Sequence, residues 1–111
     1  MGELIRIGCA QYTAHNGDSG TNLAIIERLA TAAAKDGVKL LVFPELSVTG
    51  YARSEVIVAA AEPIPGPIST QLGSIANKYG VAIAAGLVEK DSTTGHLHNT
   101  MLLLDQSGAE V

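Results

Sequence analysis

The sequence predicts an α/β fold built on parallel strands, and three observations support this prediction. Two apolar segments, residues 4–10 and 39–43, flank a segment whose apolar residues recur at helical spacing. The second of them is short and continuously apolar, which is typical of a parallel strand covered on both faces. Gly37 stands between helix and strand, where a residue free to adopt positive φ ends a helix. A right-handed crossover then places the two strands parallel.

The first helix is predicted from its cap and its apolar face. A polar segment, residues 13–20, follows the first strand. Thr21 or Asn22 can then cap the helix, because their side chains can accept a hydrogen bond from the first turn. The predicted apolar face consists of Leu23, Ile26, Ala30 and Ala33, widened by Ile25, Leu29 and Ala32.

A loop and two further helices are predicted after the second strand. Pro44 ends that strand, and residues 47–51 form a loop. Residues 54–61 are predicted as a short helix and residues 68–79 as a longer one. Gly80 closes the longer helix.

The last third of the chain predicts a hairpin. Residues 81–88 and 98–104 are apolar strands joined by a polar turn at 91–95, so an antiparallel pair is expected. A further strand is predicted to begin at Ala109. We therefore expect residues 1–111 to be part of one larger domain.

Composition narrows the function classes. The chain has 111 residues, 47% of them apolar and 16% charged, which predicts one folded domain with an aliphatic core. A net charge of −4 without a basic cluster argues against nucleic-acid binding. No apolar run approaches the length of a membrane span, and no secretory signal is visible, so a cytoplasmic protein without membrane association is expected. The single cysteine, Cys9, excludes a disulfide framework.

Glu45 is the strongest candidate for chemistry. It follows the second predicted strand directly, with Pro44 fixing its approach and Gly50 allowing the loop to turn. Open α/β sheets place their sites at the carboxyl ends of parallel strands, where loops are held by a rigid scaffold. A carboxylate there can act as a general base or acid, although an isolated Pro-Glu pair is more often a solvated loop residue.

The segment 43–51, which reads FPELSVTGY, resembles the first catalytic signature of the nitrilase superfamily of carbon–nitrogen hydrolases. Shorter pieces follow in the order of that family, so the resemblance covers essentially the whole chain. They are the first strand at residues 5–11, the Asn22-Leu23 opening of the first helix, the strand at 80–86, and Asn99-Thr100 followed by Asp105 to Gly108.

The resemblance implies a fold and a mechanism. The family fold is a four-layer αββα sandwich, of which this chain would form a part with the order β-α-β-(α)-α-β-β. The family site is a Glu–Lys–Cys triad without a cofactor. By resemblance, Glu45 is the base that activates the cysteine, which attacks a nitrile or amide carbon and forms a thioester that water then hydrolyses. The lysine stabilises the oxyanion.

The chain departs from the family pattern after the Asp-x-x-Gly turn. The family lysine and cysteine follow that turn, whereas this chain ends at Val111. Cys9 precedes Glu45, so it is interpreted as a small buried core residue. We therefore expect this chain alone to be inactive and to associate through uncovered apolar surface. None of the lysines, Lys35, Lys39, Lys78 and Lys90, occupies the matching position.

Other candidate residues have secondary roles. Phe43 and Tyr51 could line a substrate pocket or pack in the core and loop, and Asn99 is expected to satisfy backbone groups beside the site. The histidines are too scattered to predict a metal site. They are His15, His96 and His98.

Two functions from different classes remain open. The first is part of a hydrolase acting on a small amide, nitrile or N-carbamoyl compound, with an amide favoured and a homo-oligomer expected. The second is a shortened, non-catalytic homologue that acts as a binding protein. A small nucleotide-binding domain is disfavoured because the glycines do not form a phosphate-binding G-x-G-x-x-G pattern.

Overall fold

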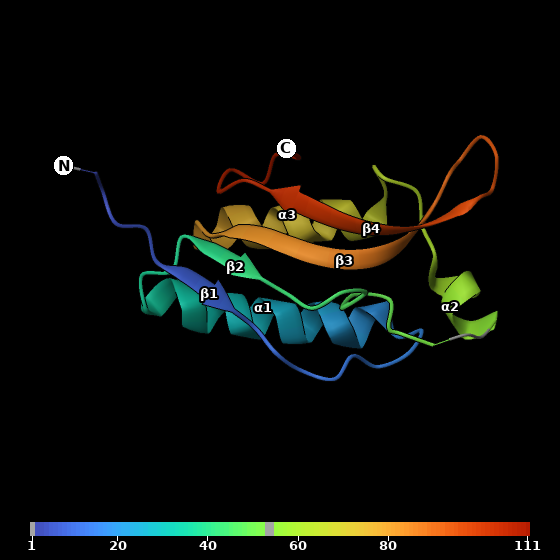
Figure 1. Cartoon of the computed structure of the whole chain (residues 1–111), viewed down its shortest axis with the longest axis horizontal. Coiled ribbons are helices and arrows are strands. Elements are labelled where there is room, and N and C mark those ends of the chain that lie inside the picture. Colours follow the sequence, from blue (N-terminus) through green and yellow to red (C-terminus); the bar gives the residue numbers. More distant parts are fainter. Residues whose placement is uncertain (1, 53–54) are drawn as a thin grey trace.

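The computed structural model describes residues 2–52 and 55–111, and within them four strands form one sheet, which Figure 1 shows. The strand order β1-β2-β3-β4 follows the sequence. β1 pairs with β2 and β2 with β3 in parallel, whereas β3 and β4 form an antiparallel hairpin. These pairings confirm the predicted parallel unit and the predicted hairpin. The strands are β1 (Ile7–Cys9), β2 (Leu40–Val42), β3 (Ala82–Lys90) and β4 (Leu97–Leu104).

The helices are α1 (Ser19–Lys35), α2 (Glu55–Ala60) and α3 (Pro67–Tyr79). The prediction that Thr21 or Asn22 caps α1 is wrong, because Asp18 is the N-cap and accepts a hydrogen bond from the Thr21 amide at 3.0 Å. The predicted glycine end of α3 is confirmed by Gly80 at φ 64°. Within the described ranges, no helix has both the length and the apolar character to span a membrane.

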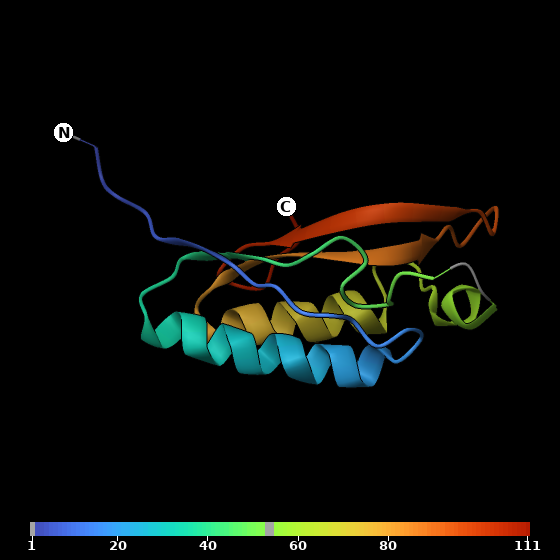
Figure 2. The same cartoon turned by 60° about the horizontal axis from the view of Figure 1, so that its bottom comes forward.

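The hydrophobic core lies between one face of the sheet and the two long helices. Figure 2 shows α1 and α3 side by side beneath the sheet, on the same side of it. Burying a large aliphatic side chain of this kind stabilises the fold by about 1.5–3 kcal/mol. The most deeply buried large side chains in this layer include Ile26, Ile68, Leu72, Ile83, Leu87 and Leu104.

The opposite face of the sheet is apolar but largely open among the described residues. Side chains alternate along a strand, so residues two apart share this face. Ile7 is 58% exposed, Met101 51% and Leu103 38%. The prediction that the second strand is covered on both faces is therefore wrong here: Leu41 is buried under the helices, but its neighbours are only half-buried.

Cys9 is exposed, which contradicts its interpretation as a buried core residue. It lies on the edge strand β1 and pairs with Val42, whose own side chain is only half-buried. Because paired residues of neighbouring strands share a face, the Cys9 side chain points to the open face rather than to the helices. We call this surface the open face; its apolar members are Ile7, Cys9, Leu40, Val42, Ala82, Ala84, Met101 and Leu103.

The segment after β4 returns along that strand. Asp105 donates its amide to Ala109 at 2.8 Å across a turn, and Glu110 then forms an isolated bridge with Leu104. The predicted strand beginning at Ala109 is present only as this bridge.

Candidate functional site

Glu45 lies in a tight turn at the carboxyl end of β2. The Phe43 amide continues the β2–β3 pairing by donating to the Ala84 carbonyl at 2.8 Å. The chain then leaves the strand, and the Ser47 amide donates to the Pro44 carbonyl at 3.2 Å. Leu46 adopts φ 52°, a left-handed conformation that non-glycine residues rarely take and that tends to occur at functional sites.

The segment after Glu45 is not a strand, but it is hydrogen-bonded to β3 where a neighbouring strand would lie. The Val48 amide donates to the Gly86 carbonyl at 2.9 Å. The hydroxyl of buried Thr49 accepts from the Val88 amide at 3.1 Å, and the hydroxyl of buried Ser47 faces the Gly86 amide at 3.4 Å. Because side-chain hydroxyls satisfy strand amides here, the turn is fixed in position although it is not a strand.

Gly86 permits the closest approach between β3 and the turn. A Cβ at this position would lie 3.1 Å from the Glu45 carbonyl carbon and 3.2 Å from its Cα, and closer still to the Leu46 amide nitrogen. Only glycine leaves room for this backbone contact. The position of Glu45 over the sheet therefore depends on residue 86 being a glycine.

Asn99 contacts the Glu45 side chain directly. Its Nδ2 donates a hydrogen bond to Oε1 of Glu45 across the β4–turn interface. Asn99 is two residues from Met101 and four from Leu103 along β4, so its side chain shares the open face with theirs. The sequence-based expectation was that Asn99 satisfies backbone groups, whereas its hydrogen-bond partner is the Glu45 carboxylate.

A pocket opens beside Glu45. It is lined by Glu45, Tyr51 and the segment 12–16, of which Tyr12, Thr13, Ala14 and Asn16 contribute. Tyr51, 71% exposed, also lines an adjoining hollow with Leu46, Ala52 and Asn99.

Tyr12 lines this pocket and is half-buried. Its hydroxyl donates to the Ser47 carbonyl at 2.9 Å, and its ring meets Phe43 edge-on at 6.3 Å between centroids. Burial raises the pKa of the Tyr12 phenol, so this group stays neutral and acts as a donor. Phe43 is 2% exposed and belongs to the hydrophobic core, a position that favours packing over contact with a substrate.

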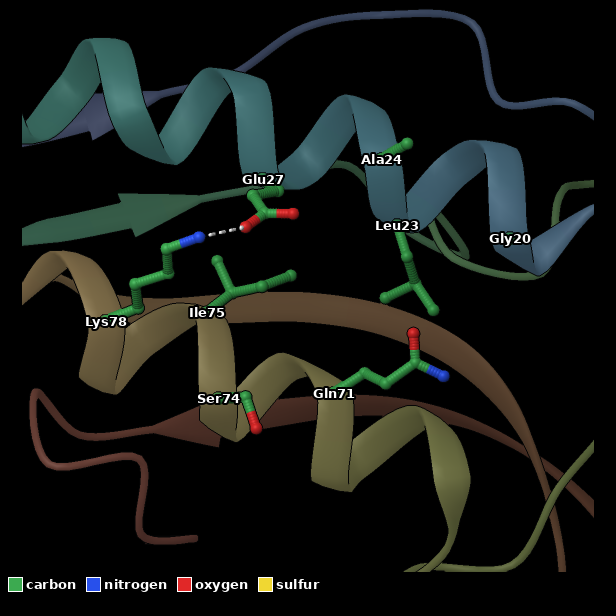
Figure 3. Close-up of a pocket in the computed structure, with 8 residues that line it drawn as sticks. All are labelled: Gly20, Leu23, Ala24, Glu27, Gln71, Ser74, Ile75 and Lys78. Atoms are coloured by element: carbon green, nitrogen blue, oxygen red, sulfur yellow. Dashed lines mark hydrogen bonds and ion pairs between the residues drawn. The ribbon is translucent and has the colours of Figure 1, made fainter.

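A separate groove lies on the outer surface between α1 and α3 (Figure 3). Lys78 and Glu27 form an ion pair across it at 3.3 Å, and the Tyr79 hydroxyl donates to the same carboxylate at 3.0 Å. These hydrogen bonds, that of Tyr79 foremost, hold the pKa of Glu27 below its usual range. The groove shares no lining residue with the pocket beside Glu45, and its contacts join two helices at the surface.

The histidines do not converge with other ligands. Among the described residues, no group of three or more His, Cys, Asp or Glu side chains is arranged to hold a metal ion. His98 pairs with Glu89 in the hairpin, whereas His15 lies in the loop before α1.

Sequence reasoning missed the four residues that the segment 12–16 contributes to this pocket, Tyr12, Thr13, Ala14 and Asn16. All four lie in the loop after β1, more than 25 residues before Glu45 in the chain. Their only sequence signal was their position after a parallel strand, because the carboxyl ends of parallel strands meet at one edge of the sheet.

The fold and the position of the turn define a class of protein: an α/β layer with a carboxylate held at the end of a parallel strand. Residues 6–111 match the carbon-nitrogen hydrolase family, and the chain belongs to that family. The nitrilase-superfamily resemblance of the sequence is thereby confirmed.

Relatives with assigned activities include both nitrilases and amidases. The chain is 32% identical to a bifunctional nitrilase/nitrile hydratase of Nicotiana tabacum, with 82% of this chain and 31% of that protein covered. It is 32% identical to a nitrilase of Pyrococcus abyssi, with 95% and 40% covered. It is 29% identical to an N-carbamoylputrescine amidase of Solanum lycopersicum, with 97% and 36% covered.

Solved structures agree with this assignment. An amidase from Nesterenkonia sp. superimposes with a TM-score of 0.77 at 29% identity, covering 96% of this chain and 40% of that chain. A cysteine-to-alanine mutant of the same amidase has been solved in complex with butyramide. The chain thus spans between about a third and two fifths of the length of these relatives.

Proposed function

We propose that the chain supplies the general base of a hydrolase that cleaves the C–N bond of a small amide, and that Glu45 is this base. The observation that carries the proposal is the position of Glu45: it lies at the carboxyl end of β2, is oriented by Asn99, and borders an accessible pocket. A carboxylate oriented in this way can accept a proton from a nucleophile placed beside it.

The proposed reaction follows the family resemblance. The thiol proton of a cysteine passes to the Glu45 carboxylate as sulfur attacks the amide carbon. The proton then leaves with the departing ammonia, and water hydrolyses the thioester to the acid. A lysine stabilises the oxyanion in both steps. We propose that this cysteine and this lysine lie in polypeptide outside residues 1–111. Cys9 does not fit the role, because it lies on β1 and precedes Glu45, whereas the family cysteine follows the base in the chain.

The open face supports this division of the domain. Its exposed apolar positions are ones that a second sheet would cover in an αββα sandwich. The chain also spans less than half of each relative named above. We therefore propose that residues 1–111 form the first part of a single domain, and that this part alone does not hydrolyse substrate.

An amide is favoured over a nitrile as substrate. The Nesterenkonia amidase has been solved with butyramide, and the tomato relative is an N-carbamoylputrescine amidase. The plant and archaeal nitrilases among the relatives make a short aliphatic nitrile the alternative to test.

The test compares two lengths of the protein. Residues 1–111 and the full product of the coding sequence are each incubated with butyramide and butyronitrile, and ammonia release is measured. We expect turnover of butyramide only by the longer form, and loss of at least about 10³-fold in kcat for Glu45→Gln, as for removal of an essential proton acceptor. Glu3→Gln, a neutralisation at the exposed N-terminal segment, is the matched control.

Three outcomes would contradict the proposal. Retained activity in Glu45→Gln would remove Glu45 from the role of base. Faster turnover of butyronitrile than of butyramide would show that the substrate is a nitrile and not an amide. A coding sequence that ends at residue 111, with a folded but inactive product, would favour the non-catalytic binding protein instead.

A further inference from the structure

Asn22 is a fully buried polar side chain at the start of α1, with an exposed fraction of 0%. It does not cap the helix. Its Oδ1 accepts from the His15 amide at 2.8 Å, and its Nδ2 donates to the carbonyls of His15 and Val48, each at 2.8 Å. A buried amide is costly unless its hydrogen bonds are made, and here both donors and one acceptor are used.

These three bonds join the two segments that form the pocket beside Glu45. His15 lies in the segment 12–16, which makes one wall, and Val48 lies in the turn that carries Glu45. Val48 is itself bonded to Gly86 of β3, so Asn22 fixes the first wall to the same framework as the base.

Two further contacts join the same segments. The Gly17 amide donates to the Thr49 carbonyl at 2.8 Å, and the Tyr51 amide donates to Oδ1 of Asn16 at 3.0 Å. Gly50, at φ 95°, leaves room for Asn16, because a Cβ there would lie 2.7 Å from the Asn16 Oδ1. Asn16 and Tyr51 are exposed residues, whereas Asn22 is fully buried.

We propose that Asn22 is a positioning residue for the reaction: it sets the distance between the pocket wall at 12–16 and the Glu45 carboxylate. It touches neither substrate nor Glu45 and acts through the His15 and Val48 backbone. This inference rests on the proposed function of Glu45, and it assigns to α1 a role in the site besides core packing. The amide is specifically required, because a carboxylate at this position would face two carbonyl acceptors and a leucine would leave them unpaired.

The test uses Asn22→Leu and Asn22→Asp, with Ser69→Ala as matched control. Ser69 is also a buried polar residue at a helix start, and among the described residues its hydroxyl bonds only Gly66. The first readout is independent of turnover: the NMR signal of the Asn99 side-chain amide, which reports its hydrogen bond to Glu45. Exchange of the Gly17 and Tyr51 amides with solvent is measured in the same samples.

We expect both Asn22 variants to shift the Asn99 signal and to accelerate amide exchange at Gly17 and Tyr51, while Ser69→Ala leaves both readouts unchanged. In the active form of the enzyme, kcat should fall by about 10²-fold with little change in KM, the scale of a displacement of about 1 Å between reacting groups.

Asn22→Asp keeps the side-chain volume and so guards against a variant that does not fold. An Asn99 signal unmoved in both variants, or a kcat loss no larger than that of Ser69→Ala, would overturn the proposal. If the unsubstituted enzyme turns over no amide or nitrile, the proposed function fails, and the NMR signals still decide whether Asn22 positions Glu45.

Discussion

Replacing Gly86 by alanine tests whether the turn that carries Glu45 depends on close backbone contact with β3. The added Cβ would lie 3.1 Å and 3.2 Å from the carbonyl carbon and Cα of Glu45, and nearer to the Leu46 amide nitrogen. All three atoms belong to the backbone, so no rotamer change relieves the contact. The turn must move away from the sheet.

Two opposing effects set the magnitude. Alanine restricts the unfolded chain more than glycine and would stabilise the protein by about 0.4–1 kcal/mol in an unstrained site. Overpacking against a backbone that cannot rotate away costs about 1–3 kcal/mol. We therefore expect the free energy of unfolding of Gly86→Ala to fall by about 1–2 kcal/mol.

The assay is urea unfolding followed by far-ultraviolet circular dichroism, with both proteins at one concentration. The control is Gly20→Ala on α1, where the nearest atom to a new Cβ is the Asp18 Oδ1 at 3.8 Å. That variant should lose no stability and could gain up to about 1 kcal/mol from helix propensity. The reasoning is refuted if Gly86→Ala is as stable as the wild type and its Asn99 side-chain amide signal is unchanged.

Three further predictions concern pH and association. Burial raises the pKa of Tyr12 above its ordinary 10.0, so the stability that depends on the neutral phenol should be intact below that pH and decline above it; Tyr12→Phe should lose this alkaline decline in a pH series of melting temperatures. Hydrogen bonds from the Ser107 hydroxyl and the Ala109 amide lower the pKa of Asp105 below its ordinary 3.8. The turn should therefore be ordered above that pH and lose its order as the pH falls. Faster exchange of the Ala109 amide in Asp105→Ala at neutral pH would support this, and unchanged exchange would contradict it. Residues 1–111 alone should self-associate through the open face, and Leu103→Lys should shift the mass measured by light scattering toward the monomer; a monodisperse wild-type monomer would disprove the association.

Local sequence signals predicted the elements well because each depends on nearby residues. The apolar periodicity of α1 and α3, the glycines that follow them and the turn of the β3–β4 hairpin all act over a few positions. The strands β1 and β2 are shorter than predicted, since pairing and not apolar character decides where a strand begins and ends.

Errors arose where the local pattern was compatible with more than one environment. Asn22 has a good capping side chain, but Asp18 caps the helix, and the three-dimensional course of the 13–18 loop turns Asn22 inward. Cys9 lies in an apolar strand, and the apolar pattern of that strand does not indicate which face of the sheet the helices cover.

The candidate site was predicted in part. Glu45 could be placed at a strand end from its neighbours, and Asn99 was expected only to satisfy backbone groups beside the site. The hydrogen bond between them joins residues 54 positions apart, and no spacing rule relates such residues. The role of Gly86 was invisible in the sequence, because the space left by an absent side chain has meaning only once the neighbouring backbone is known.

The shared face of Asn99, Met101 and Leu103 on β4 has a consequence for how this protein can change in evolution. The residue that holds the Glu45 carboxylate and the apolar side chains of the open face stand on one surface, two residues apart. A layer that packs on Met101 would therefore lie next to Asn99 and to the hollow that Asn99 lines with Leu46 and Tyr51. A substitution in such a layer would alter both how tightly the layer packs on β4 and the surroundings of the Glu45 carboxylate, so we expect these two properties to change together.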